Sequence, residues 1–118
     1  MAYTTENFDQ TQIPLLLDKI PVGVTVIDLD CHILYYNEYC AERLNRKPEW
    51  LGKDIRLCHQ KQESNDRIDQ MLEAFKNGRK EAFCYDANPY GDPLAISLAP
   101  LEIDGVLVGC VHSVIFKE

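Results

Sequence analysis

The residues Gly23-Val24-Thr25-Val26-Ile27-Asp28, followed by His32-Ile33-Leu34-Tyr35-Tyr36 and then Asn37, decide the predicted fold of this chain. Both runs are rich in β-branched and aromatic side chains, which favour strands, and the residues between them suit a turn. We therefore predict a hairpin of two strands, Val22–Asp28 and His32–Tyr36. Asn37 is a residue type that caps helices, so a helix is expected over Glu38–Asn45.

A longer helix is predicted further along the chain. Its apolar residues follow the i, i+3, i+4, i+7 spacing of one helix face, and they are Ile68, Met71, Leu72 and Phe75. Ser64 or Asn65 can cap its start, and Gly78 follows its expected end at Asn77. The segment Asp54–Gln62 before this helix shows no decisive pattern.

The remaining segments complete the predicted order of elements. Residues Thr5–Ile20 have apolar residues at roughly helical spacing, with Pro14 suited to the first turn of a short helix. Three strands are predicted after the long helix, over Glu81–Asp86, Pro93–Leu101 and Val106–Phe116. Strands joined by tight turns pair antiparallel, and helices inserted between the second and third of five strands give an α+β fold.

The composition limits the classes of function. The chain has 118 residues, the size of one domain, and its formal net charge of −7 argues against nucleic acid and anionic membranes as partners. No apolar run approaches the roughly 20 residues of a membrane-spanning helix. The polar, acidic start is unlike a signal peptide, so we expect a cytoplasmic protein whose five cysteines are reduced thiols.

No enzyme motif is present in the sequence. It lacks a Gly-rich phosphate loop, a His-Glu-x-x-His pair and a Gly-x-Ser-x-Gly turn. Its carboxylates are scattered, and none form a pair whose positions suggest acid–base catalysis. We therefore expect a protein that is not an enzyme.

The layout resembles the PAS domain family from about Leu17 to Phe116. The residues that carry the resemblance are Gly23–Asp28, Ile33 and Asn37 in the first hairpin, Pro48–Lys53 before the long helix, and Gly105 with Val108-Gly109 at the last strand. The resemblance implies a curved sheet that encloses a small pocket with the helices, and we predict the strand order 2-1-5-4-3. We expect residues 1–20 to form a helical extension and residues 21–118 to form the PAS domain.

A closer resemblance concerns Leu51–His59 and the helix after it. This segment is similar to a PAS subgroup of bacterial transcription regulation proteins that carries a Cys-His step here, and some carbon-monoxide-sensing relatives have a haem-ligating His near this point. The resemblance implies His59 as a metal ligand to haem iron. The alternatives are that His59 caps the following helix or lines the pocket wall.

Other residues are expected around the same pocket. Cys58 is either a redox-sensitive thiolate or a packed thiol. Met71 and Phe75 are expected to face the cofactor from the long helix. Leu94-Ala95-Ile96 stands where haem-binding relatives have a Met, so a second ligand stays open, with Cys84 or His112 as substitutes.

Flavin is a further cofactor to consider. The residues Gly52–Arg56 resemble the Gly-x-Asn-Cys-Arg motif of blue-light flavin PAS domains, but Ile55 occupies the place of the photoactive cysteine. Covalent flavin photochemistry is therefore not expected. Tyr35, Tyr36 and Tyr39, near Trp50 in the sequence, either stack on a planar ligand or are ordinary core and surface aromatics.

Two functions from different classes follow from these observations. The first is a sensor domain that binds a small molecule or cofactor, with haem as one candidate, and that signals through dimerisation. The second is an interaction module without a ligand. A homodimer through the apolar N-terminal segment is expected, and an effector domain of a longer protein is a candidate partner.

Overall fold

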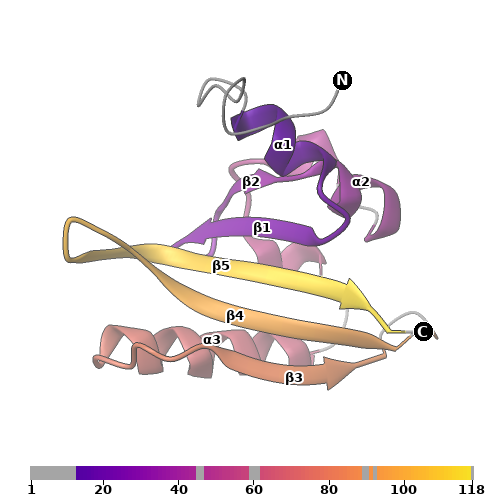
Figure 1. Cartoon of the computed structure of the whole chain (residues 1–118). Coiled ribbons are helices and arrows are strands. Elements are labelled where there is room, and N and C mark those ends of the chain that lie inside the picture. Colours follow the sequence, from indigo (N-terminus) through magenta and orange to yellow (C-terminus); the bar gives the residue numbers. More distant parts are fainter. Residues whose placement is uncertain (1–12, 45–46, 59–61, 89–90, 92, 118) are drawn as a thin grey trace.

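The computed structural model describes residues 13–44, 47–58, 62–88, 91 and 93–117. Its elements, with η for a 3-10 helix, are α1 (Ile13–Lys19), β1 (Gly23–Asp28), β2 (Ile33–Tyr36), α2 (Glu38–Arg43), η2 (Pro48–Trp50), η3 (Ile55–Cys58), α3 (Gln62–Lys76), β3 (Phe83–Ala87), β4 (Leu94–Ile103) and β5 (Val106–Phe116). The strands form one antiparallel sheet in the order β2-β1-β5-β4-β3 (Figure 1). The predicted α+β class and strand order are therefore confirmed.

The first and last strands are neighbours at the centre of the sheet. β1 pairs with β5 from Gly23, opposite Val114, to Asp28, opposite Gly109. Gly109 permits this close approach, because a Cβ at its position would overlap the carbonyl oxygen of Ile27. The predicted pairing of these two strands is confirmed.

Local side-chain hydrogen bonds stabilise the turn of the β1–β2 hairpin and the start of the helix after it. The Asp28 carboxylate accepts hydrogen bonds from the backbone N–H groups of Asp30 and His32, both at 2.9 Å. The Asn37 side chain accepts from the backbone N–H of Cys40 at 3.3 Å, which caps the start of α2. The predicted turn and the predicted cap are both confirmed.

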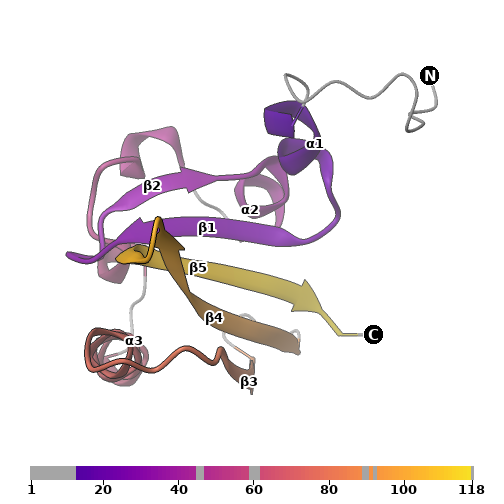
Figure 2. The same cartoon turned by 60° about the vertical axis from the view of Figure 1, so that its left-hand side comes forward.

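The interior consists of two clusters of buried side chains on one face of the sheet. α3 lies near β3 and α2 lies next to β1 (Figure 2). The first cluster includes the apolar face of α3, and its members are Ile27, Cys31, Ile33, Ile55, Ile68, Met71, Leu72, Phe75, Leu98 and Cys110. The second cluster includes one residue of α2 and the residue that follows this helix, and its members are Cys40, Leu44, Leu94 and Val114. The predicted core face of the long helix is confirmed.

The long helix begins earlier than predicted. α3 starts at Gln62, so Ser64 and Asn65 lie inside the helix and not at its cap. Ser or Asn inside a helix costs only about 0.5 kcal/mol relative to Ala, and Gln62 and Glu63 are good helix formers, so the helix extends back past the expected cap. Gly78 has a φ of 106°, as expected for the residue after a helix.

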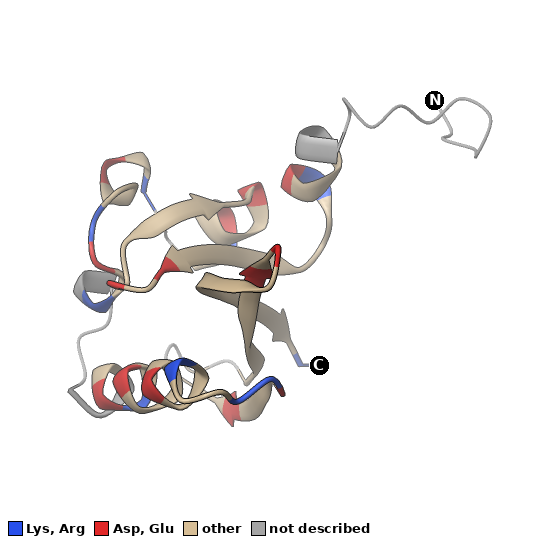
Figure 3. Cartoon of the chain, turned by 90° about the vertical axis from the view of Figure 1, so that its left-hand side faces the viewer, with Lys and Arg blue, Asp and Glu red and all other residues tan. Residues whose placement is uncertain are grey.

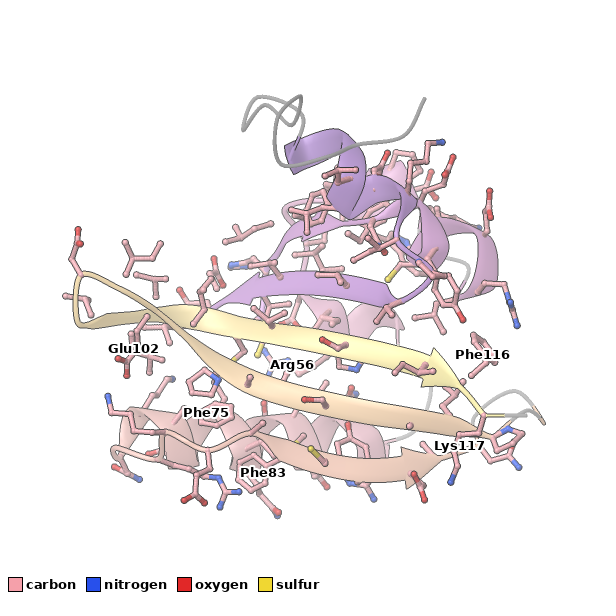
Figure 4. All side chains as sticks on the ribbon, in the orientation of Figure 1. Arg56, Phe75, Phe83, Glu102, Phe116 and Lys117 are labelled. Carbon is pink, nitrogen blue, oxygen red and sulfur yellow. The ribbon has the colours of Figure 1, made fainter. Side chains whose placement is uncertain are left out.

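The two edges of the sheet differ. The edge strand β2 is covered by residues 52–55, because the Ile33 N–H donates to the Lys53 carbonyl at 2.8 Å and the Gly52 N–H donates to the Ile33 carbonyl at 2.7 Å. At the other edge, α3 packs beside β3, and the ring centroids of Phe75 and Phe83 lie 5.4 Å apart (Figure 4). This second edge carries the groove described next.

Candidate functional site

A groove of about 500 Å³ lies between α3 and the edge strand β3. Met71, which is only 5% exposed, belongs to the buried face of α3 and forms an apolar floor. Strand alternation turns Phe83 and Tyr85 toward the helix, on the sheet face that carries the core. The volume is in the range of small-molecule sites, roughly 300–1,000 Å³. The lining residues are Arg67, Gln70, Met71, Phe83, Cys84 and Tyr85.

Two arginines lie over the aromatic rings at this edge. The guanidinium carbon of Arg67 is 4.7 Å from the Tyr85 ring centroid, and that of Arg79 is 3.7 Å from the Phe83 ring centroid. Burial raises the pKa of the Tyr85 hydroxyl above its ordinary value, and the positive charge of Arg67 opposes this rise. Tyr85 is therefore an uncharged phenol near neutral pH, and the groove combines aromatic walls with positive charge.

The structure brings two of the predicted cofactor-binding residues to this groove. Met71 and Cys84 both line it, and Cys84 is exposed. Phe75 is 3% exposed in the first core cluster and is not among the groove's lining residues. The side chain of Cys58 and the whole of His59 lie outside the described residues, so their predicted roles stay predictions.

The described residues at this edge do not fit a haem. Met71 and Phe75, which are expected to face the cofactor, are instead buried members of the first cluster. Among the described residues, their side chains contact the rest of the cluster and leave no gap there for a porphyrin ring. Haem ligation by His59 stays a prediction, and the visible absorption spectrum of the purified protein tests it.

Sequence reasoning missed Arg67 and Tyr85 as groove residues. Arg67 lies four residues before Met71, so the helical spacing that identified Met71 also places Arg67 beside it. Tyr85 lies two residues after Phe83, and strand spacing places both rings on one face. These spacings were available in the sequence, but the approach of α3 to β3 arises only when the chain folds.

A second, polar cleft of about 480 Å³ lies between α3, the β1–β2 turn and the segment before η3. Arg56 holds its walls together, because its Nε donates to the Asp54 carboxylate at 2.9 and 3.0 Å and another nitrogen donates to Asp69 of α3 at 3.0 Å. The hydrogen bond and charge of Arg56 lower the pKa of Asp54. Ile55 between them is fully buried in the core, so a core residue fills the place of the photoactive cysteine.

A buried histidine lies in the sheet away from the groove. His112 on β5 is paired with Thr25 on β1 and lies between Cys110 of the first cluster and Val114 of the second. Thr25 in turn has its hydroxyl oxygen 3.5 Å from the sulfur of Cys40. His112 does not line the groove, so the two substitutes named for a second ligand, Cys84 and His112, are not brought to one site.

The tyrosines near Trp50 do not form one stacking surface. Tyr36 and Trp50 pack against the first core cluster. The ring of Tyr39 instead contacts Phe116, with centroids 6.1 Å apart. Tyr36 and Trp50 are therefore core aromatics, whereas Tyr39 packs on the end of β5.

The sheet face turned away from α2 and α3 is largely apolar along β1, β4 and β5, and we call this area the outer face. Figure 1 looks onto this face with α3 behind the sheet, and Figure 3 shows charged residues gathered on the helices and turns more than on the strands. Ile115 near the end of β5 is 51% exposed. The alternation of buried and less buried positions assigns to this face Val24, Val26, Ala95, Ser97, Ala99, Leu101, Val111, Ser113 and Ile115.

The arrangement defines a class of protein. One antiparallel sheet in the order 2-1-5-4-3, with α2 and α3 over one face, a groove at one edge and a largely apolar second face, is the architecture of a small sensory or signalling module. The PAS domain family matches residues 13–115, and the chain belongs to this family. PAS domains are generally sensory and regulatory modules and not enzymes. No curated protein sequence matches the chain.

Solved structures share this fold. A C-terminal domain from Streptococcus mutans superimposes with a TM-score of 0.74 at 20% identity, covering 98% of this chain and 90% of that one. The PAS domain of BvgS from Bordetella pertussis has a TM-score of 0.74 at 18% identity, covering 94% and 88%. The PAS domain of an HTR-like protein from Haloarcula marismortui has a TM-score of 0.65 at 16% identity, covering 91% and 96%. Within the described residues, no helix is both long and apolar enough to cross a membrane.

Proposed function

We propose that this chain is a sensory PAS domain that detects a small organic molecule in the groove between α3 and β3. The observation that carries the proposal is the groove itself, whose floor is the Met71 side chain and whose wall carries the rings of Phe83 and Tyr85. Concave, largely apolar sites with a few polar groups are the usual form of small-molecule sites. A ligand there would contact the long helix and the edge strand at once.

Such a ligand has a path to the rest of the sheet. β3 pairs with β4 over Phe83–Ala87, and β4 pairs with the central strand β5 along nearly its whole length. A change in the distance between α3 and β3 would therefore be transmitted to β5 through the backbone hydrogen bonds that join β3, β4 and β5.

The experiment uses a neutral aromatic probe, 2-naphthamide, and protein labelled at the methionine methyl groups. We expect the probe to shift the Met71 methyl signal and the amide signals of β3. The variant Gln70→Trp fills the groove from an exposed position of α3 and should abolish these shifts. The control variant Glu73→Trp, also exposed on α3 but outside the groove lining, should leave them intact. An unchanged Met71 signal at millimolar probe would refute the proposal.

A second function, self-association, is favoured by the outer face. Contiguous apolar surface of this kind usually marks an interaction site, and a second copy of the chain is the occupant that we propose. The variant Ile115→Lys places a charge on this face and should weaken the dimer in sedimentation experiments. The control Leu51→Lys changes a similarly exposed apolar side chain, 47% against 51%, that lies outside the outer face, and it should not weaken the dimer. A wild-type chain that is monomeric at micromolar concentration contradicts this second proposal.

A further inference from the structure

We infer that the groove between α3 and β3 selects a small aromatic carboxylate. This inference rests on the proposed sensory function of the same groove and names the chemical class of its ligand. It is carried by two features, which are the aromatic wall and the orientation of Arg67.

The aromatic wall favours a planar apolar body. Phe83 and Tyr85 are partly buried and contact the first core cluster, so their rings are held by packing while part of each stays accessible. Met71 adds a thioether, which makes favourable contacts with aromatic rings. The aromatic ring of a ligand in this groove would displace water and would instead stack on these side-chain rings and contact the Met71 sulfur.

Arg67 favours a carboxylate at one end of that body. Its guanidinium lies over the Tyr85 ring and is also hydrogen-bonded to the Tyr85 side chain. A guanidinium carries five N–H donors, so this one hydrogen bond does not use them all. Among the residues that the structure describes, no carboxylate lies within ion-pair distance of Arg67, whereas Arg56 is paired with both Asp54 and Asp69. A stacked arginine whose remaining N–H donors are not paired with any described carboxylate is suited to bidentate binding of a ligand carboxylate.

The same groove disfavours other ligand classes. A cationic ligand would meet the positive charges of Arg67 and of Arg79, whose guanidinium covers Phe83. A phosphate ester would find a single arginine in the lining, where phosphate sites usually combine several donors. A metal ion would find one thiol, that of Cys84, and no second strong ligand among the six lining residues.

The test compares three probes of one shape: 2-naphthoate, neutral 2-naphthamide and cationic 2-naphthylmethylammonium. At low salt we expect 2-naphthoate to bind at least about tenfold more tightly than the amide, because a carboxylate adds an opposite charge and a second acceptor oxygen for the guanidinium, whereas the amide offers one uncharged acceptor. Arg67→Gln should remove this preference, because it should lower the affinity for 2-naphthoate far more than the affinity for the amide. Lys76→Gln removes the same charge from an exposed position of α3 outside the groove lining and should keep the preference.

The outcomes separate the ligand class from the proposed function. If all three probes shift the Met71 methyl signal with equal affinity, or if Arg67→Gln leaves the preference intact, the groove binds ligands but the carboxylate inference is wrong. If no probe shifts that signal, the sensory proposal for the groove fails together with it. Thermal unfolding of Arg67→Gln establishes that the variant is folded, so loss of the preference cannot be attributed to loss of structure.

Discussion

Gly109 is a position where the fold depends on the absence of a side chain. A Cβ there would overlap the carbonyl oxygen of Ile27 in the neighbouring strand, and backbone atoms move aside only at high cost. We predict that Gly109→Ala lowers the free energy of unfolding by about 3 kcal/mol or more, measured by urea denaturation. Gly23→Ala meets the sulfur of Cys40 at 3.1 Å, which a side chain can relieve, so it should cost about 1 kcal/mol. Equal losses for the two variants would contradict this explanation.

Asp54 gives the fold a dependence on pH. Arg56 lowers the pKa of Asp54 in the folded state, so the pair stabilises the fold above the unfolded pKa near 3.8, and this stabilisation is lost as the pH falls through the lower folded pKa. We predict that Asp54→Asn loses less stability than the wild type between about pH 6 and about pH 3, as compared by urea midpoints. Asp104→Asn, in the exposed β4–β5 turn, should behave like the wild type. If the wild type and Asp54→Asn lose the same stability over this pH range, Asp54 does not contribute to the pH dependence of folding.

The helix α2 joins elements that lie at opposite ends of the sequence. At its start, Lys19 of α1 pairs with Glu38 at 2.8 Å. At its end, the guanidinium carbon of Arg43 lies 4.2 Å from the ring centroid of Phe116, close to the C-terminus (Figure 4). This short helix therefore contacts both the N-terminal helix and the end of the central strand β5.

Asn37, the residue before α2, connects this helix to α1 and to the start of β1. Its buried side chain accepts hydrogen bonds from the N–H groups of Val24 and Cys40 and donates to the carbonyls of Leu17, at 3.0 Å, and Val22, at 2.7 Å. We predict that Asn37→Ala lowers the free energy of unfolding by about 2–3 kcal/mol in urea denaturation, because several buried backbone groups lose their partners. The control Asn77→Ala, at the exposed end of α3, should change it by less than about 0.5 kcal/mol.

At the scale of elements, the sequence predicts what depends on local pattern and misses what depends on tertiary contact. The Asn37 cap, the core face of α3 and the strand β5 follow from residue type and spacing, and all three are found as predicted. The strand β3 begins at Phe83 and not at Glu81, where the guanidinium of Arg79 instead binds the carbonyls of Glu81 and Ala82. A contact of that kind has no counterpart in the spacing of apolar residues.

In the candidate site, too, local sequence pattern predicts some residues, and others depend on tertiary contacts. Met71 was predicted from helical periodicity and lies in the groove, whereas Arg67 and Tyr85 become neighbours only because α3 packs beside β3. Cys58 and His59 were predicted from resemblance alone, and their roles stay predictions. The boundary placed between residues 20 and 21 also stays a prediction.

At the scale of the whole molecule, charge and apolar surface oppose one another in self-association. The formal net charge of −7 makes two copies repel, while the outer face favours their contact. Raising the salt concentration from about 0.1 M to about 1 M shortens the Debye length from about 10 Å to about 3 Å, which screens the repulsion and leaves apolar burial intact. We therefore predict that the dimer becomes several-fold tighter over this range, as measured by sedimentation equilibrium. In the Ile115→Lys variant the gain should be smaller, because added salt does not restore the apolar contact. An interface that instead weakens with salt would be held by ion pairs, and the outer face would not be its main surface.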